Sequence, residues 1–283
     1  MSSTTPTIPD RLLALAADFT RHHDALRDLA LLRGPNPGSN LVQRVIPRTQ
    51  ALARSSMDVS DTVETMPRLY RSPEVKAAME RLAQLGALAL LAADHILDAA
   101  DLLLDGTPAS GAGQVAGYGT PLLEAGRRIV LARQLTSLGS EDCLATARLL
   151  AGELHAQQHL PIEHRPTGLS RTQFRALEAV AAGRVTLDRV QDRAHVRPDE
   201  FRLSMSTVRS LESRGLVHRE TCPLPLHDER LHLTPDGRTA LTALFALPVA
   251  TPRQARRSGV STPPSTARPA SRPAVSPARS ATR

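Results

Sequence analysis

The segment Ser206–Leu241, STVRSLESRGLVHRETCPLPLHDERLHLTPDGRTAL, constrains the fold more than any other part of the chain. Val208 and Leu211 stand three positions apart, the spacing that places side chains on one face of a helix. Gly215 follows this stretch, and glycine is the residue best suited to the left-handed backbone at which many helices end. We therefore predict a short helix that ends at Arg214-Gly215.

A hairpin and a second helix are predicted next. Residues 216–220 and 229–233 are short runs with strand-type patterning, and the proline-containing polar loop between them makes a hairpin. Thr234 suits an N-cap, Pro235 suits the first helical position, and Asp236 lies near the positive end of the helix dipole. The segment is thus expected to fold as helix, hairpin, helix, an order found in many small DNA-binding domains.

Two phrases of this segment, STVRSLESRGLV and LTPDGRTAL, resemble the winged helix-turn-helix domains of MarR-type bacterial regulators, and the resemblance extends over residues 169–247. In that family the helix before the RGLV phrase enters the DNA major groove, and the hairpin, called the wing, lies along the minor groove or the backbone. The resemblance implies that the reading helix contacts DNA through Ser206, Thr207, Arg209, Ser210 and Ser213. It implies that the wing contacts DNA through His218, Arg219, His227 and Arg230.

The region before the reading helix has two interpretations. Ser170 is expected to cap a first helix that ends at Gly183. Residues 185–187 and 201–205 then alternate apolar and polar side chains with period two, which favours an extra β-hairpin. The alternative is a middle helix over residues 187–194, as in the standard motif.

Residues 1–160 predict an all-helical bundle. The clearest helix has Ser72 as its cap, Pro73 at its first position and an end at Asp105. Its apolar positions keep three-four spacing and are rich in alanine, which allows close helix packing within a bundle or across a dimer interface.

The other helices of this bundle are less regular. One begins at Pro9-Asp10, and a second helical zone over residues 40–70 is expected to be interrupted by Pro47 and Pro67. Two further helices are expected at residues 121–138 and 140–158.

The net charge is concentrated at the C-terminus. Residues 252–283 contain seven arginines and no acidic residue, which accounts for the whole formal net charge of +7. Their Pro-, Ser- and Ala-rich composition predicts disorder. This basic tail is either an arm for phosphate backbones or a solvated extension without a specific role. The arginines expected to bind phosphate are Arg253, Arg256, Arg257, Arg268 and Arg272. The region 169–250 is only weakly basic, with twelve arginines against ten acidic residues.

Three groups have spacings that suit a metal ion: Asp94, Asp98, Asp101 and Asp105 beside His95; His155 with His159; and His218, Cys222, His227 and His232. A solvated acidic face, a polar helix end and exposed or phosphate-contacting histidines are the favoured interpretations. No metal or cofactor is predicted. Cys143 lies among Ala and Leu, as a core thiol does, and no nucleophile–base pair is recognisable, so an enzyme is not expected.

The sequence therefore predicts a mainly α protein with an N-terminal helical bundle (1–160), a C-terminal winged-helix domain (169–250) and a disordered basic tail (251–283). The N-terminus lacks the features of a signal peptide and no apolar run spans a bilayer, so a cytoplasmic location is expected. The leading hypothesis is a homodimeric transcriptional regulator that binds double-stranded DNA. The alternative is a helical scaffold whose winged helix binds protein.

Overall fold

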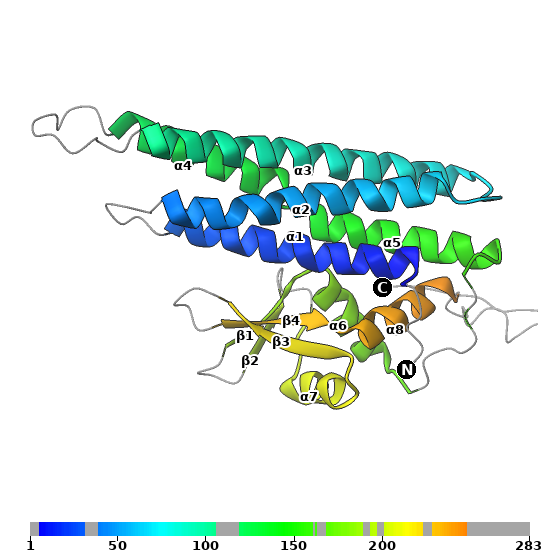
Figure 1. Ribbon diagram of the computed structural model, residues 1–283. Coiled ribbons are helices and arrows are strands. Elements are labelled where there is room, and N and C mark those ends of the chain that lie inside the picture. The colour runs from blue at the N-terminus through cyan, green and yellow to red at the C-terminus, as the bar shows by residue number, and fades with distance from the viewer. Residues whose placement is uncertain are drawn as a thin grey trace, which may run out of the picture. The chain divides into compact units, whose positions relative to one another are not determined.

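The computed structural model describes residues 6–31, 39–105, 119–160, 162, 168–188, 193–196, 201–222 and 228–247. The described part is mostly helical with one small antiparallel sheet, and residues 1–248 cluster into a single compact unit (Figure 1). Its elements are α1 (Ile8–Leu31), α2 (Ser39–Glu64), α3 (Pro73–Asp105), α4 (Gly119–Leu135), α5 (Gly139–Ala156), α6 (Arg171–Ala181), β1 (Val185–Asp188), β2 (Arg193–Val196), α7 (Met205–Ser213), β3 (Val217–Thr221), β4 (Asp228–Leu233) and α8 (Pro235–Ala246).

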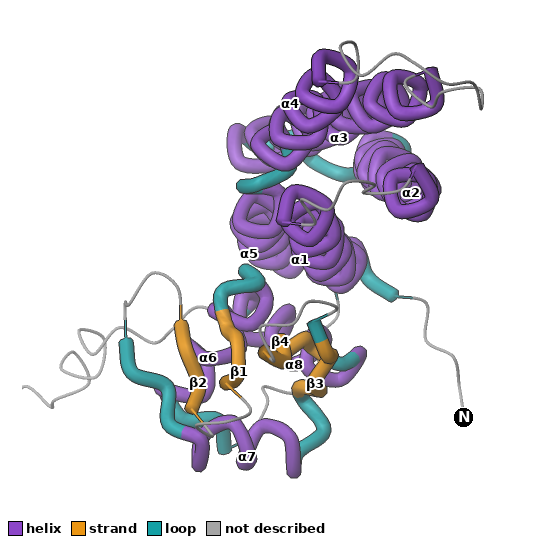
Figure 2. The backbone as a smooth tube through the Cα atoms, turned by 90° about the vertical axis from the view of Figure 1, so that its left-hand side faces the viewer, coloured by secondary structure: helices purple, strands orange, loops and turns teal. Residues whose placement is uncertain are grey.

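Helices α1 to α5 form a bundle, and the sheet with α6, α7 and α8 forms a second layer against it (Figures 1 and 2). In α3 the Ser72 Oγ accepts a hydrogen bond from the Val75 amide at 3.2 Å, and Pro73 takes the first position, so the predicted N-cap is confirmed. The predicted end at Asp105 is confirmed as well. The alanine-rich seam of α3 is buried at Val75, Ala78, Leu82, Leu85, Ala89, Ala92, Ile96 and Ala99.

The expected interruption of α2 at Pro47 is wrong, because α2 continues through this residue. A proline inside a helix removes one backbone hydrogen bond and usually breaks the helix. Here Val42 and Val45 before the proline, and Leu52 and Ala53 after it, are all buried. Packing of this continuous apolar face outweighs the local preference of proline. The helix ends before Pro67, as predicted.

The two segments expected to be separate domains share one hydrophobic core. Leu12 and Phe19 of α1 belong to the same buried cluster as Leu177 of α6 and Leu241 of α8. A polar contact joins the same helices, since the Thr242 hydroxyl donates to Asp10 Oδ1 at 2.8 Å. Helices α6 and α8 are therefore packed against α1 and α5 and share their core.

The sheet has the strand order β2-β1-β4-β3, and all neighbouring strands are antiparallel. The antiparallel strands β1 and β2 form a hairpin after α6, so the favoured hairpin interpretation is confirmed. The position of its second strand was wrong, because β2 covers Arg193–Val196 and not residues 201–205. Leu203 is instead a buried residue just before α7, which explains its strand-like spacing with Phe201.

Local signals define the ends of the helices in this layer. Ser170 and Gln173 form a reciprocal capping box at the start of α6. Gly183 and Gly215 follow α6 and α7 with φ values of 69° and 69°. At each glycine its own amide and the amide of the next residue donate back to the last turn, as when Leu216 N donates to the Leu211 carbonyl at 3.0 Å. Both predicted helix ends are thereby confirmed.

The start of α8 is held against the end of α7. Thr234 caps α8 by accepting from the Gly237 amide at 3.0 Å, and its own amide donates to the Leu216 carbonyl at 3.1 Å. A Cβ atom at Gly237 would overlap that same carbonyl. Glycine at this position therefore permits the approach that joins α7, the wing and α8.

We expect Gly237→Ala to lower the free energy of unfolding by about 1–3 kcal/mol, because the added methyl group collides with backbone that cannot rotate away. Urea denaturation followed by circular dichroism measures the change. Gly126→Ala is the matched control, since a Cβ in this part of α4 meets nothing within 4 Å. It should raise stability by about 1 kcal/mol through helix propensity. Equal effects of the two substitutions would contradict the prediction.

Candidate nucleic-acid interface

Helix α7 lies on the side of the second layer that faces away from the bundle, as Figures 1 and 2 show. Its start is defined by Ser204, whose Oγ accepts from the Thr207 amide at 3.2 Å. Val208 and Leu211 are fully buried beneath it. The predicted reading residues occupy the remaining positions: Ser206, Arg209 and Ser213 are exposed, and Thr207 and Ser210 are half-buried. The structure thus brings all five together on one outer helix.

The hydroxyl groups of this helix also stabilise its own geometry. Ser204 Oγ lies 2.9 Å from Ser206 Oγ and 2.9 Å from Thr207 Oγ1. Ser210 Oγ accepts from Gln173 Nε2 at 3.0 Å, which ties α7 to the start of α6. Ser213 Oγ donates to the Ser210 carbonyl at 3.0 Å. These contacts position α7 firmly while leaving its outer side open.

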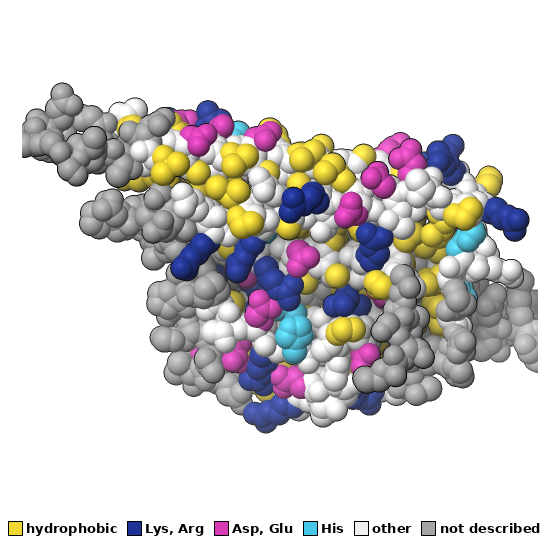
Figure 3. All heavy atoms as spheres, in the orientation of Figure 1, with side chains coloured by type: hydrophobic (Ala, Val, Ile, Leu, Met, Phe, Trp, Pro, Cys, Tyr) yellow, Lys and Arg dark blue, Asp and Glu magenta, His cyan; other side chains and the backbone are white. Residues whose placement is uncertain are grey.

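Two cations beside α7 carry no motif and were not anticipated. Arg202 precedes the helix and Arg214 is its C-cap residue, and both are exposed. Together with Arg209 they place positive charge at both ends and the middle of α7. In the space-filling view, cationic side chains alternate with acidic and neutral ones over the lower face, where Figure 1 places α7 (Figure 3). In the sequence, the one signal for a role of Arg202 and Arg214 is that they lie just before and just after the predicted helix.

Arg219 of the wing is exposed but held by two carboxylates. Its Nε donates to Glu212 Oε1 at 2.5 Å, and its Nη1 donates to Glu229 Oε2 at 3.3 Å. The hydrogen bond that Arg219 donates to the Glu212 carboxylate is the main reason that the pKa of Arg219 lies above its usual value. His218 is exposed on β3, and its ring centroid lies 5.9 Å from that of His232. The described wing therefore carries little uncompensated positive charge.

The prediction that Arg230 contacts DNA is wrong for this structure. Arg230 is 8% exposed, and its guanidinium forms a bidentate ion pair with Asp24 of α1, at 2.6 Å and 2.9 Å. Its Nη1 also donates to the Gly183 carbonyl. The side chain points toward α1 because β4 is an inner strand of the sheet, packed beside the bundle. His227 and the tail residues Arg253, Arg256, Arg257, Arg268 and Arg272 lie outside the described residues.

Two buried histidines lie near this ion pair. His232 lies 3.5 Å from Glu220, which is itself bound by Arg21 of α1 at 2.9 Å. His22 Nε2 is 2.8 Å from Thr49 Oγ1. Burial lowers the pKa of His232 to about 4 and that of His22 to about 4, so both rings are neutral at pH 7. His232 is thus part of the junction between wing and bundle and not a phosphate contact.

None of the three candidate metal groups assembles among the described residues, where no set of three His, Cys, Asp or Glu side chains converges. In the acidic stripe Asp98 is paired with Arg128 at 3.2 Å, and the same guanidinium lies 3.4 Å from His95 Nδ1. His155 and His159 turn to different carbonyl oxygens, those of Leu160 and Arg68. Cys143 is buried, and burial raises the pKa of its thiol.

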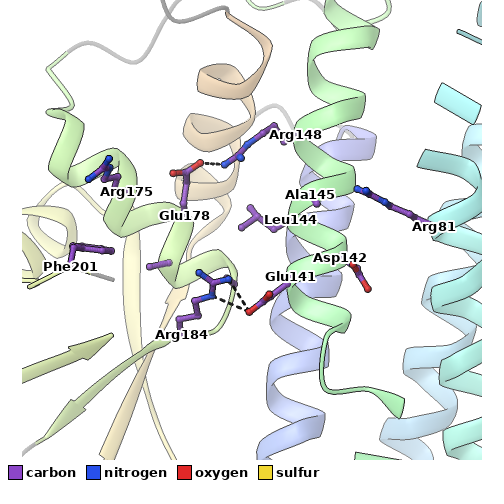
Figure 4. Close-up of a pocket in the computed structure, with 12 residues that line it drawn as sticks. Arg81, Glu141, Asp142, Leu144, Ala145, Arg148, Arg175, Glu178, Arg184 and Phe201 are labelled. Carbon is purple, nitrogen blue, oxygen red and sulfur yellow. Dashed lines mark hydrogen bonds and ion pairs between the residues drawn. The ribbon is translucent and has the colours of Figure 1, made fainter. Parts of the chain in front are cut away.

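A cavity of about 610 Å³ is a groove between α5 and α6 (Figure 4). Two ion pairs cross it: Arg148 with Glu178, and Arg184 with Glu141 at 3.0 Å. In Figure 4 these side chains reach toward one another from the two sides. The two ion pairs across the groove thus hold the two layers together. Among the residues that line the groove, none is Cys or His.

No family model, curated protein or solved structure matches this chain. Among the described helices, none combines the length and the apolar character needed to cross a bilayer.

We expect Asp24→Ala to destabilise the protein by about 3–5 kcal/mol, because it leaves the buried Arg230 guanidinium without its counter-charge. The double replacement of Asp24→Leu with Arg230→Met should recover most of this loss. Asp18→Ala is the control on the same helix, since its ion pair with Arg21 is exposed and contributes at most about 1 kcal/mol. Chemical denaturation of the four proteins gives the comparison, and an Asp24→Ala effect no larger than the control would contradict it.

Proposed function

We propose that this chain is a DNA-binding transcriptional regulator whose winged-helix region, similar to that of MarR-type regulators, reads a duplex with α7. The observation that carries the proposal is the placement of α7 on the face away from the bundle, with Ser206, Arg209 and Ser213 exposed. Arginine and hydroxyl side chains on an outer helix match the donors and acceptors of base edges and phosphates.

The distribution of ion pairs supports this assignment despite the small net charge of the region. The acids Glu178 and Glu220 are engaged by arginines of α5 and α1, and Glu212 and Glu229 are engaged by Arg219. The pairs of Glu178 and Glu220 lie at the junction with the bundle, and the pair of Glu212 with Arg219 joins α7 to β3. The side chains of Arg202, Arg209 and Arg214 are exposed at α7, so they are accessible to the phosphates of a duplex.

We further propose that two copies pair through the leucine face of the bundle. This face consists of the exposed residues Leu90, Leu91, Leu97 and Leu104 of α3 and Leu122, Leu123 and Leu131 of α4, which are 38–59% exposed. Figure 3 shows apolar side chains along the part of the surface where Figure 1 places α3 and α4. Leu90, Leu97 and Leu104 are seven residues apart, so they form one stripe along α3, as in a coiled-coil seam.

Charge favours a second copy as the occupant of the leucine face. The exposed carboxylates of Asp94 and Asp101 lie along α3, and Arg127 of α4 is 68% exposed with only a 3.5 Å surface pair to Glu124. In a two-fold arrangement the acidic residues of α3 in each protomer meet Arg127 of the other protomer, so the contact occurs twice. Two-fold symmetry would then place the two α7 helices on half-sites about one helical turn apart, or a multiple of it.

The second candidate function is a helical scaffold whose winged-helix region binds protein. The burial of Arg230 and the pairing of Arg219 favour it, because they remove two of the expected phosphate contacts from the wing. The two candidates are separated by the dependence of DNA binding on the charge of α7 and on the sequence of the duplex.

For the DNA-binding proposal, we expect the chain to prefer particular duplexes selected from a random library. Arg209→Ala should cost about 1–3 kcal/mol on the preferred duplex and much less on others, because only base contacts carry sequence information. Fluorescence anisotropy at two salt concentrations measures both affinities. Arg44→Ala, at an exposed position of α2, is the control and should bind like the wild type.

The scaffold alternative makes the opposite forecast for the same titration. Binding without sequence preference that disappears when residues 251–283 are deleted would contradict the regulator proposal and favour the scaffold. In that case Arg209→Ala and Arg44→Ala would be indistinguishable.

For the dimer proposal, we expect sedimentation velocity to give a dimer for the wild type and a monomer for the double replacement of Leu97→Asp and Leu131→Asp. The introduced carboxylates would be buried without counter-charges in the paired leucine face. Leu138→Asp is the control, because this leucine is 62% exposed in the turn after α4. A wild-type monomer, or dimers that survive the double replacement, would contradict the use of this face.

A further inference from the structure

The capping box of α6 continues by one hydrogen bond into α7. Gln173 Oε1 accepts from the Ser170 amide at 2.8 Å, and Gln173 Nε2 donates to Ser210 Oγ at 3.0 Å. Helix α6 lies between the bundle and α7 and contacts both (Figure 1). One side chain, whose own position is set by the start of α6, therefore contacts a hydroxyl group in the middle of α7.

The capping box fixes the direction of the hydrogen bond between Gln173 and Ser210. A glutamine amide has an acceptor oxygen and a donor nitrogen, and a half-turn of the amide exchanges their places. Here that exchange would bring the amide nitrogen, which can only donate, against the backbone N–H of Ser170, which also donates. The nitrogen of Gln173 therefore points to Ser210, and the Ser210 hydroxyl is the acceptor.

The hydrogen of the Ser210 hydroxyl consequently remains available to another acceptor. A helical serine or threonine commonly donates to the carbonyl three or four residues earlier, as Ser213 does to the Ser210 carbonyl and Thr49 to the Val45 carbonyl, each at 3.0 Å. Among the described residues, Ser210 Oγ has the hydrogen bond from Gln173 and no such carbonyl partner. Ser210 is half-buried, so the acceptor for its hydrogen comes from outside the protein.

We infer that Gln173 determines part of the base preference of α7, a role that rests on the DNA-binding function proposed above. A serine hydroxyl by itself contacts donor and acceptor groups of base edges alike. Once Ser210 accepts from Gln173, a contact to the N4 amino group of cytosine would leave the hydroxyl hydrogen without an acceptor, which costs free energy. The acceptor atoms N7 and O6 of guanine satisfy this hydrogen. Gln173 acts through Ser210 and is a positioning residue.

The sharpest test reverses the direction of this hydrogen bond with Gln173→Glu. The capping box is retained, because a glutamate carboxylate also accepts from the Ser170 amide. The same carboxylate offers Ser210 only acceptor oxygens, so the hydroxyl donates to it and presents only lone pairs to the duplex. A hydroxyl that can only accept fits the N4 amino group of cytosine and not the acceptor atoms of guanine.

The measurement is the affinity for a duplex selected from a random library and for versions with single base pairs exchanged. The position contacted by Ser210 is the one at which Ser210→Ala loses its base preference. There the wild type should favour guanine over cytosine by about threefold to tenfold, the effect of one neutral hydrogen bond, and Gln173→Glu should favour cytosine over guanine. Combining Gln173→Glu with Ser210→Ala should abolish both preferences.

Thr172→Glu is the matched control, because it adds the same charge at the neighbouring exposed position of α6. It should weaken binding to all duplexes alike and leave the guanine preference unchanged. A Gln173→Glu variant with the same base preference as Thr172→Glu overturns the inference alone. A wild type that prefers no duplex contradicts the regulator proposal and the inference together, so the two failures are distinguishable.

A measurement on the free protein covers the case in which Gln173→Glu fails to fold. The Nε2–Hε2 cross-peaks of Gln173 report the hydrogen bond to Ser210, and they should shift in Ser210→Ala. Those of Gln157, which donates to the Tyr70 carbonyl at 3.0 Å, should stay in place. Gln173 cross-peaks that do not move in Ser210→Ala overturn the inference.

Discussion

Helix α1 is buried on two sides, and most of the architecture follows from that constraint. Leu12 and Phe19 pack into the core shared with α6 and α8, whereas Leu26 and Leu29 belong to the cluster between α1, α2, α3 and α4. The close approach requires glycine at positions 139 and 183, where a Cβ would overlap side chains of α1. Because both sides of α1 are buried, this helix joins the bundle to the layer of the sheet, α6 and α8 through extensive contacts.

This junction also changes what the wing can do. Arg230, from the inner strand β4, is used to hold α1 through Asp24, and Arg219 is used to hold Glu212 and Glu229. The sheet side of this layer therefore holds the layer to the bundle, while α7 on the opposite side remains available to a partner (Figure 1).

Short-range signals explain what was predictable. The caps Ser72, Ser170 and Thr234 and the terminating Gly183 and Gly215 act over a few residues, and each appears where the sequence predicted it. The extra hairpin was predictable because the alternation of apolar and polar residues is also a short-range signal. The same alternation placed the second strand at residues 201–205, whereas β2 covers Arg193–Val196. The exposure of Ser206, Arg209 and Ser213 followed from the burial of Val208 and Leu211 on the other side of the same helix.

The amino-acid sequence by itself thus determined the helices, their ends, the helix–hairpin–helix order and the outward residues of α7, because these depend on neighbours within one or two turns. Only the tertiary structure decided that α2 runs through Pro47, that Arg230 is buried and that the two segments share a core. The Arg230–Asp24 pair joins residues 206 positions apart, and no local pattern encodes such a partner. Long-range packing and charge pairing overrode the local expectation at each of these places.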